Sequence, residues 1–349
     1  LVLVAVLLSA LAGAALILWR TAAANEARAV ESEAATTGLV IDLEREIFAR
    51  NGIELAIAQC RTEDEVIAAA QGCPGILLQY APITERVIVA LPSLGIVSRI
   101  GAGYDTVDAD ACARQGVWVA NSPDYGVGEV ATHALALALA VTRNIVAYHR
   151  DIAAGRWHYL SSGPLRRPRE MTLGIVGLGR IGKRMAQISR DVFKRVVAYD
   201  PYLIDGDFPV HVERAPTLDA LAGTADVVSL HTPLTGETRG MINGRFFGAL
   251  KRSSYLVNTA RGAVVDVKDL LAALDAGILA GAGLDVLPAE PIPRDSPLLA
   301  DPRIVLTPHA AFFSREAEQE LRRKAAQNLV TWLATGRPDY VVVAGTRVP

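Results

Sequence analysis

Three predicted strands in the C-terminal half of the chain each end beside a side chain that can do chemistry. Arg261 follows the strand that ends at Asn258, and His309 follows the last strand. Two acids, Asp285 and Glu290, follow the strand between them. A guanidinium binds a carboxylate through two parallel hydrogen bonds, and an imidazole oriented by a carboxylate is an effective proton carrier. Since ligands of open α/β sheets bind at the carboxyl ends of the strands, we expect a reaction to take place there.

A glycine-rich turn is the second feature with a chemical purpose. Leu173–Val176 is a short apolar run typical of a buried strand, and Gly177, Gly179 and Gly182 lead from it into a helix. The first glycine makes a tight turn, the second lets the backbone approach a pyrophosphate, and the third allows close packing of helix and strand. The sequence therefore predicts a phosphate-binding turn.

An acid at the end of the next strand extends this prediction. The helix that begins near Arg180 directs N–H groups and the positive end of its dipole toward a phosphate. Residues 195–199 form a second predicted strand, and Asp200 follows it, eighteen residues after Gly182. An acid at this place accepts hydrogen bonds from the adenosine ribose and repels the 2′-phosphate of NADP. We therefore predict an NAD site.

The alternation of strand and helix patterns predicts an α/β fold with parallel sheets. In the first part of the chain, strands are expected at 53–58, 75–79 and 96–100, and helices at 41–50, 63–70 and 84–90. After the glycine turn, further strands are expected at 226–230, 255–258, 283–286 and 304–306. Ser314 then caps a final helix that runs to about residue 334. Because the central unit begins after a complete α/β region, we expect this helix to return to the first domain.

One predicted helix, over residues 129–150, is apolar on most of its faces. It contains alternating alanine and leucine at 134–140. Such a helix must be buried, either between domains or in a dimer interface. The sequence leaves both placements open.

The composition excludes several classes of function. The 349 residues carry a formal net charge of −2 and no large basic block, so nothing points to nucleic acid. Three cysteines without metal-binding spacing indicate reduced thiols of a cytoplasmic protein; they are Cys60, Cys73 and Cys112. Five histidines also lack metal-ligand spacing and are interpreted as structural; they are His133, His149, His158, His211 and His231. We therefore predict no metal site.

An apolar segment opens the chain. Residues 1–18 contain no charge, and Trp19 and Arg20 follow them. At ~1.5 Å per residue such a segment just spans the ~30 Å of a hydrocarbon core. Residues 1–20 are therefore interpreted either as a membrane anchor or, because no initiator methionine is present, as the product of a misplaced start. Both interpretations leave the body of the protein in the cytoplasm.

Taken together, these motifs resemble the D-isomer-specific 2-hydroxyacid dehydrogenase family. The motifs GLGRIG (177–182), NTARG (258–262), AEP (289–291) and TPHAA (307–311) stand in the family's order and spacing, and the resemblance covers residue 39 to about residue 340. Four segments resemble more narrowly the C-terminal-binding-protein branch, namely 99–108, 199–203, 256–262 and 307–317.

The resemblance implies a fold and an assembly. It implies two Rossmann-like, doubly wound parallel-sheet domains, of which the substrate domain is discontinuous in sequence. The substrate domain is expected at 28–126 plus 311–349, and the NAD-binding domain at 127–310. A homodimer formed through the NAD-binding domain is implied as well.

The resemblance also implies roles for individual residues. Arg261 matches the arginine that binds the substrate carboxylate and polarises its keto oxygen, His309 the general acid/base, and Glu290 the acid that hydrogen-bonds this histidine. Besides the three glycines, the residues that match nucleotide contacts are Arg180, Ile181, Asp200, Thr232, Thr259 and Asp285. The substrate loop of the other domain is matched by Arg99, Ala102 and Gly103.

Three of the assigned positions have a second interpretation. Asp285 is equally well explained as the cap of a turn between a strand and a loop. Tyr80 and Phe312 are interpreted either as walls of the substrate pocket or as ordinary core aromatics. Phe312 stands where animal corepressor members of the branch carry Trp, which puts their keto-acid preference in doubt for this chain.

The resemblance implies an NAD-dependent dehydrogenase that interconverts a 2-keto acid and a D-2-hydroxy acid by hydride transfer. The alternative is an NADH-responsive, corepressor-like scaffold with weak catalysis. The intact Arg261, Glu290 and His309 favour the enzyme, because a scaffold does not need a general acid. Oxidation of formate or phosphite is a third possibility. Glu290 argues against formate, since formate dehydrogenases of this superfamily carry Gln at the acid position.

Overall fold

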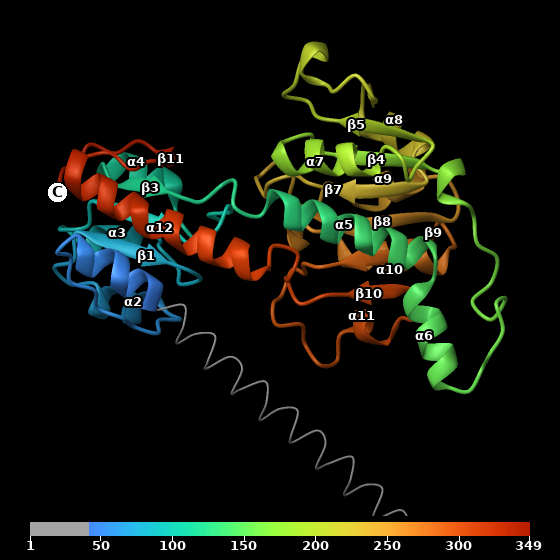
Figure 1. Cartoon of the computed structure of the whole chain (residues 1–349), viewed down its shortest axis with the longest axis horizontal. Helices are drawn as coiled ribbons and strands as arrows, with labels where there is room; N and C mark the ends of the chain where they lie inside the picture. Colours follow the sequence, from blue (N-terminus) through green and yellow to red (C-terminus); the bar gives the residue numbers. More distant parts are fainter. Residues whose placement is uncertain (1–41) are drawn as a thin grey trace, which may run out of the picture. The chain divides into compact units, whose positions relative to one another are not determined.

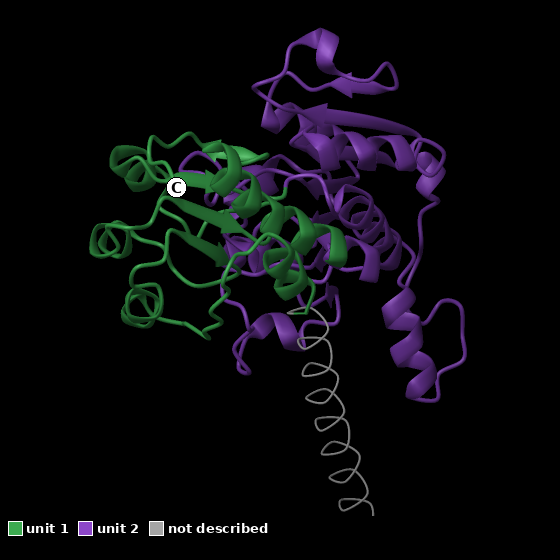
Figure 2. Ribbon diagram, turned by 60° about the vertical axis from the view of Figure 1, so that its left-hand side comes forward, with its two compact units in different colours: residues 1–122, 319–349 green, residues 123–318 purple. Residues whose placement is uncertain are grey.

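The computed structural model describes residues 42–349, which divide into two compact units (Figure 2). Unit 1 comprises the described residues up to Ser122 together with Gln319–Pro349, and unit 2 comprises Pro123–Glu318. The units change at 122/123 and 318/319, whereas the sequence analysis places the domain changes at 126/127 and 310/311. The assignment of substrate and NAD-binding domains to these ranges stays a prediction. The apolar segment 1–20 lies outside the described residues.

Unit 1 contains a four-stranded sheet in the order β1-β2-β3-β11. The strands β1 (Gly75–Leu78), β2 (Ile96–Arg99) and β3 (Trp118–Ala120) are parallel, and β1 and β2 lie where strands were predicted, but β11 (Val341–Val343) pairs antiparallel with β3. This edge strand was not predicted. The strand predicted at 53–58 is wrong, because that segment has no regular structure. Its apolar Ile53 and Leu55 pack against the core of the unit without joining the ladder.

Helices cover both faces of this sheet. On one face lie α2 (Glu63–Ala69), α3 (Glu85–Ala90) and α4 (Ala109–Gln115), which pack against Val97 and Val119. On the other face, residues 42–50 and α12 (Arg315–Thr335) pack against the neighbouring Ile96 and Ala120. Because successive side chains of a strand point to opposite faces, adjacent residues fill the two layers. The return of the last helix to the first unit is confirmed.

Unit 2 contains a seven-stranded parallel sheet in the order β10-β9-β8-β7-β4-β5-β6 (Figure 1). The strands are β4 (Thr172–Val176), β5 (Arg195–Tyr199), β6 (Val212–Arg214), β7 (Val227–Leu230), β8 (Ser254–Asn258), β9 (Leu279–Leu284) and β10 (Ile304–Leu306). The prediction of a doubly wound α/β fold is confirmed. The strand predicted at 283–286 was misplaced, since β9 begins at Leu279 and ends before Asp285.

The order of strands reverses at the centre of this sheet. From β4 the chain runs outward through α7 (Arg180–Ser189) to β5 and β6, and it then crosses back to β7 on the other side of β4. Open α/β sheets bind ligands at such a reversal, outside the carboxyl ends of the strands. Helices that follow the later strands are α8 (Leu218–Thr224), α9 (Gly244–Ala249), α10 (Val267–Asp275) and α11 (Pro297–Ala300). The fold therefore places the glycine turn at the point where a ligand is expected.

The helix predicted at 129–150 is two helices. Helix α5 (Val127–Thr142) ends before Asn144, which adopts a left-handed backbone with φ of 50°, and α6 (Ile145–Ala153) continues at an angle of 57°. The Asn144 side chain donates to Ser162 O at 2.9 Å, which fixes the break. Helix α5 is largely buried against α7, β8 and β9. Within residues 42–349 no single helix is long and apolar enough to cross a membrane, and only the bent pair α5–α6 reaches that length and composition.

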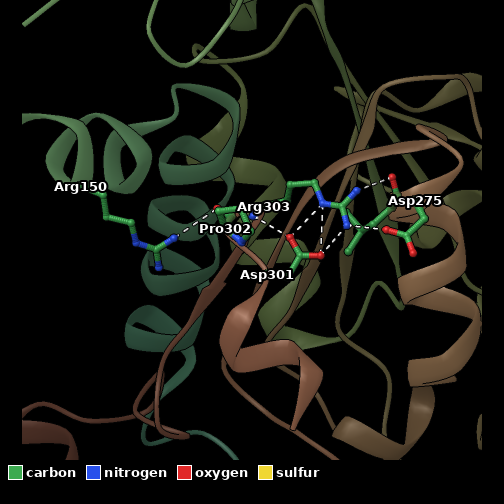
Figure 3. Close-up of polar contacts among 6 residues, drawn as sticks. Arg150, Asp275, Asp301, Pro302 and Arg303 are labelled. Carbon is green, nitrogen blue, oxygen red and sulfur yellow. Dashed lines mark hydrogen bonds and ion pairs between the residues drawn. The ribbon is translucent and has the colours of Figure 1, made fainter. Parts of the chain in front are cut away.

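The start of strand β10 is held by an ionic cluster (Figure 3). Arg303 pairs with Asp301 at 2.6 Å and with Asp275 at 2.7 Å, and it donates to Leu274 O at 2.7 Å. The two carboxylates raise the pKa of Arg303. Arg150 of α6 donates to Pro302 O at 3.3 Å. The cluster thus joins the end of α10, the start of β10 and helix α6.

Candidate active site

The three glycines of the turn after β4 are packed in the way that a phosphate-binding turn requires. Gly177 has a positive φ of 88°, and a Cβ atom on it would lie 2.7 Å from the carbonyl oxygen of His231. A Cβ on Gly182 would lie 2.1 Å from Gly177 O, so only glycine lets α7 approach the turn. Around Gly179, by contrast, a Cβ would meet nothing within 4 Å. Two glycines therefore serve packing, and the middle one faces open space.

Asp200 lies directly beside this turn. Its Oδ2 accepts from Leu178 N at 2.9 Å, and its Oδ1 accepts from Tyr202 N at 3.0 Å. A carboxylate has about four acceptor positions, so both oxygens keep capacity for the hydroxyls of a ribose. Pro201 and Tyr202 follow, and neither can offset the charge of a 2′-phosphate.

Two hydroxyls near the ends of neighbouring strands indicate room for a polar ligand. Within residues 42–349, the buried Oγ1 atoms of Thr232, just after β7, and Thr259, just after β8, have no hydrogen-bond partner. Both threonines are among the predicted nucleotide contacts. Buried hydroxyls are normally hydrogen-bonded, so these two fit a ligand rich in donors and acceptors. Together with the glycine turn and Asp200, they fit a dinucleotide. Arg180 and Ile181 lie in the first turn of α7, where Arg180 is exposed and Ile181 packs against the core of the unit.

Arg261 follows β8 at the same edge of the sheet. The backbone is tightly packed there, because a Cβ on Gly262 would lie 1.9 Å from the carbonyl carbon of Leu287. The Arg261 side chain is half-buried, and its Nη1 donates to Ala260 O at 2.7 Å. The planar guanidinium fork of Arg261 has the geometry that suits a substrate carboxylate.

His309 and Glu290 meet at the ends of β10 and β9. His309 Nδ1 lies 2.7 Å from Glu290 Oε2, and Glu290 Oε1 accepts from Leu287 N at 2.9 Å. Both side chains are more than one-third exposed, so a substrate can reach them. Because Nδ1 is bonded to Glu290, Nε2 is the ring nitrogen that can exchange a proton with a reacting oxygen.

The charge of Glu290 is set by its surroundings. Burial alone would raise the pKa of this carboxyl group. Hydrogen bonds from His309 and Leu287 N, together with the positive charge of Arg261, outweigh burial and lower the pKa below its usual value. Glu290 is therefore ionised at neutral pH, and as a carboxylate it accepts the hydrogen bond from His309 Nδ1.

Asp285 holds the loop that carries His309. Its side chain is almost completely buried, and Oδ1 accepts from Thr307 Oγ1 at 2.6 Å and from Ala310 N at 2.9 Å, while Oδ2 accepts from Ala311 N at 3.0 Å. These contacts match the interpretation of Asp285 as the cap of a strand–loop turn. A direct nucleotide contact of this carboxylate stays a prediction.

The aromatic candidates lie in different surroundings. Phe312 is half-buried and meets the His309 ring edge-on, with ring centroids 6.3 Å apart. It therefore stands where a pocket wall would lie. Tyr80, in unit 1, is 66% exposed and is no core aromatic. The guanidinium carbon of Arg99 lies 6.0 Å from the centre of its ring.

The candidate substrate loop of unit 1 is shaped by Gly101. Its φ is 147°, and a Cβ atom there would lie 1.2 Å from Arg99 Nη1. Asn121 Nδ2 donates to Ala102 O at 2.6 Å and holds the loop from β3. Gly103 lies in the same loop and is half-buried. These residues belong to unit 1, and Arg261, Glu290 and His309 belong to unit 2.

Two polar residues of unit 2 lie beside the His309 loop and had no functional role predicted from the sequence; they are His133 and Thr307. His133 of α5 lies with its Nε2 3.0 Å from Thr307 Oγ1 and 3.6 Å from Asp285 Oδ1. Thr307 was quoted within a motif without a role, and His133 was interpreted only as structural. The one available signal was a polar residue in an otherwise apolar helix, where a half-buried imidazole needs a partner.

The comparisons with known proteins identify the family. The model of the D-isomer specific 2-hydroxyacid dehydrogenase, NAD binding domain, matches residues 135–311. This chain belongs to that family. It is therefore an oxidoreductase that acts on hydroxy acids, and its cofactor is NAD. The narrower resemblance to the C-terminal-binding-protein branch stays a prediction.

Individual relatives resemble most of the chain. A glyoxylate reductase of Korarchaeum cryptofilum is 38% identical over 282 residues, which cover 79% of this chain and 85% of the relative. A glycerate dehydrogenase of Methylorubrum extorquens is 34% identical over 291 residues, which cover 81% of this chain and 90% of the relative. The crystal structure of the TT0316 protein from Thermus thermophilus matches with a TM-score of 0.78 and 33% identity, covering 86% of this chain and 96% of that one. The similarity thus includes both units.

Proposed function

We propose that this protein interconverts a small 2-keto acid and the corresponding D-2-hydroxy acid, with NAD(H) as its hydride carrier. The observation that carries the proposal is the hydrogen bond of 2.7 Å between His309 and Glu290. A protein that only binds a dinucleotide has no need of an oriented acid–base pair. Arg261 lies in the same unit, and its positive charge helps to lower the pKa of Glu290.

In this proposal the residues of unit 2 carry out the steps around hydride transfer. Arg261 binds the substrate carboxylate and draws electron density from the keto oxygen. NADH, when bound, supplies the hydride for the keto carbon. The keto oxygen gains negative charge and takes a proton from His309, while Glu290 stabilises the imidazolium. In the oxidative direction, neutral His309 removes the hydroxyl proton.

The names of the relatives support a short substrate. One relative is a glyoxylate reductase and another is a glycerate dehydrogenase. We therefore propose glyoxylate or hydroxypyruvate as the keto acid. The half-buried ring of Phe312 beside His309 would limit the room for a longer side chain.

A screen of 2-keto acids tests the proposal directly. Consumption of NADH is measured with glyoxylate, hydroxypyruvate, pyruvate and longer keto acids, and each is repeated with NADPH. We expect turnover of a short keto acid, with NADH preferred because Asp200 repels a 2′-phosphate. Arg261→Lys should lower kcat/KM by about 100-fold, since lysine keeps the charge but cannot form the bidentate hydrogen bonds to the substrate carboxylate. If no keto acid is reduced while NADH still binds and changes association with a partner, the scaffold function replaces this one.

We also propose a homodimer through unit 2 in the cytoplasm. Helix α6 and the segment after it extend from the sheet of unit 2 (Figure 1), and they expose several large apolar side chains. These are Ile145, Ile152, Trp157, Tyr159 and Leu160. Such a set on one surface segment is typical of an interface. Sedimentation of wild type and of Trp157→Ser checks this: a monomeric wild type would contradict the dimer, and a shift toward monomer in the variant would support it.

A further inference from the structure

The loop that carries His309 has an unusual backbone that needs outside support. His309 has a φ of 52°, a left-handed conformation that non-glycine residues rarely adopt. Three successive N–H groups of the loop point at Asp285: His309 N donates to its carbonyl oxygen at 2.8 Å, and the amides of Ala310 and Ala311 donate to its carboxylate. The position of the imidazole therefore depends on the position of the Asp285 carboxylate.

The hydrogen bonds around Thr307 have a defined direction. The Thr307 hydroxyl donates its one proton to Asp285 Oδ1 at 2.6 Å. His133 Nε2, 3.0 Å from the same hydroxyl oxygen, must then be the donor of the second bond. The result is a chain of donors from His133 through Thr307 to Asp285. A hydrogen bond that donates to a hydroxyl strengthens the bond that this hydroxyl donates in turn.

The packing of α5 brings His133 to this place. A Cβ atom on Gly283 of β9 would lie 3.0 Å from Leu137 Cβ of α5, so the helix lies close against the strand just before Asp285. Ala134 and Leu137, beside His133 on the helix, are buried. The close packing of α5 against β9 therefore fixes the position of the His133 imidazole. It brings this residue next to Thr307, from which 174 residues separate it in the sequence.

We infer that His133 is a positioning residue, which holds the His309 loop in its left-handed conformation through Thr307 and Asp285. It does not touch the reacting atoms, and it acts by donating from Nε2. The inference rests on the proposed function for its kinetic consequence, but its structural consequence holds without it. Loss of the donor should loosen the loop and misplace the imidazole while leaving the nucleotide turn after β4 intact.

Two variants of His133 separate the donor from simple packing. His133→Phe fills similar volume but cannot donate, and His133→Gln keeps an N–H group. We expect His133→Phe to lower kcat by about tenfold, the scale of one lost hydrogen bond, with little change in KM or in NADH affinity. His133→Gln should recover most of kcat. His149→Gln, on exposed α6, is the matched control and should behave as wild type.

A double-mutant cycle tests the route through Thr307. In a Thr307→Val background, His133→Phe should have less than about a twofold further effect, because the hydroxyl that it acts through is gone. An equal effect of His133→Phe in both backgrounds would overturn the inference. So would a His133→Gln variant as slow as His133→Phe.

Hydrogen exchange gives a readout that does not need turnover. Amide exchange over residues 304–313 should be faster in His133→Phe than in wild type and in His133→Gln, with exchange over 172–189 unchanged. Unchanged exchange in all three proteins would refute the positioning role. If wild type reduces no keto acid but the exchange pattern appears, the positioning role stands and only the proposed function fails.

Discussion

The two ends of strand β10 are held by carboxylates in opposite ways. At its carboxyl end, the Asp285 side chain is 2% exposed and accepts from neutral donors, namely the Thr307 hydroxyl and the amides of Ala310 and Ala311. At its amino end, Arg303 binds the exposed Asp275, whose side chain is 75% exposed, and the nearly buried Asp301 (Figure 3).

The difference follows from what each end has to do. Each short bond to the buried carboxylate fixes one atom of the His309 loop, and an unmade bond there costs the full desolvation of its donor. The Arg303 cluster shares five N–H groups among several acceptors, and water replaces the exposed Asp275 at little cost. The carboxyl end is therefore built for fixed geometry, whereas the amino end adds modest stability.

The largest effect is expected from removing the acid–base group that the carboxyl end positions. His309→Ala should lower kcat by about 10²–10⁴-fold, as for the loss of a general acid. NADH affinity should persist, since its predicted contacts lie at the glycine turn and Asp200. Steady-state kinetics and NADH fluorescence titration check both. Turnover near that of wild type would show that His309 is not the proton donor.

Asp285→Asn should disrupt the hydrogen bonds that hold the His309 loop at the carboxyl end of β10. The new NH₂ group would face at least one donor among Thr307, Ala310 and Ala311, which leaves a buried donor without an acceptor. We expect about 3 kcal/mol lower free energy of unfolding, together with a fall in kcat. Urea unfolding monitored by fluorescence measures the stability. A variant as stable as wild type would mean that the amides find other acceptors.

Glu290→Gln tests a second carboxylate near the carboxyl end of β10. Unlike the buried Asp285, the Glu290 carboxylate is half-exposed, so its charge changes with pH. We expect about tenfold lower kcat for reduction at neutral pH, since the imidazolium loses its partner. The acid limb of oxidation and the matching limb of reduction should move to lower pH. The pKa of Glu290 is lowered in the folded protein, so its contribution to stability is present above the usual carboxyl range and is lost as pH falls through the lowered value.

Measurements at several pH values separate these two consequences. Profiles of rate against pH in both directions give the limbs, and thermal melts between pH 3 and about pH 7 give the stability. Wild type should lose stability toward acid more steeply than the variant. Identical limbs in the two proteins would show that Glu290 does not act on His309.

The smallest effect is expected at the amino end. Arg303→Met should lower the free energy of unfolding by about 1 kcal/mol, because the pair with Asp275 is exposed to solvent and the nearly buried Asp301 keeps its hydrogen bond from the backbone N–H of residue 303. Catalysis should not change. Arg86→Met, which removes an exposed pair of unit 1, is the matched control and should change stability less. A large fall in kcat for Arg303→Met would mean that both ends of β10 serve the active site.

The sequence by itself determined the chemistry-bearing residues and the order of elements. The glycine turn, Asp200, Arg261, Glu290 and His309 were all singled out from residue type and from their place after a strand. The parallel strands of both units were largely located as well. These features depend on a few neighbouring residues, because side-chain periodicity, turn residues and helix caps act over one or two turns of chain. Local signals of this kind can be read without a structure.

Only the tertiary structure decided which of these residues meet. The break at Asn144 is fixed by a bond to Ser162, β11 joins its sheet from the far end of the chain, and His133 reaches Thr307 across 174 residues. The strand predicted at 53–58 failed for the same reason, since its apolar residues pack without pairing. Contacts between distant segments depend on how closely whole elements pack, as Gly283 allows for α5, and no short stretch of sequence carries that information.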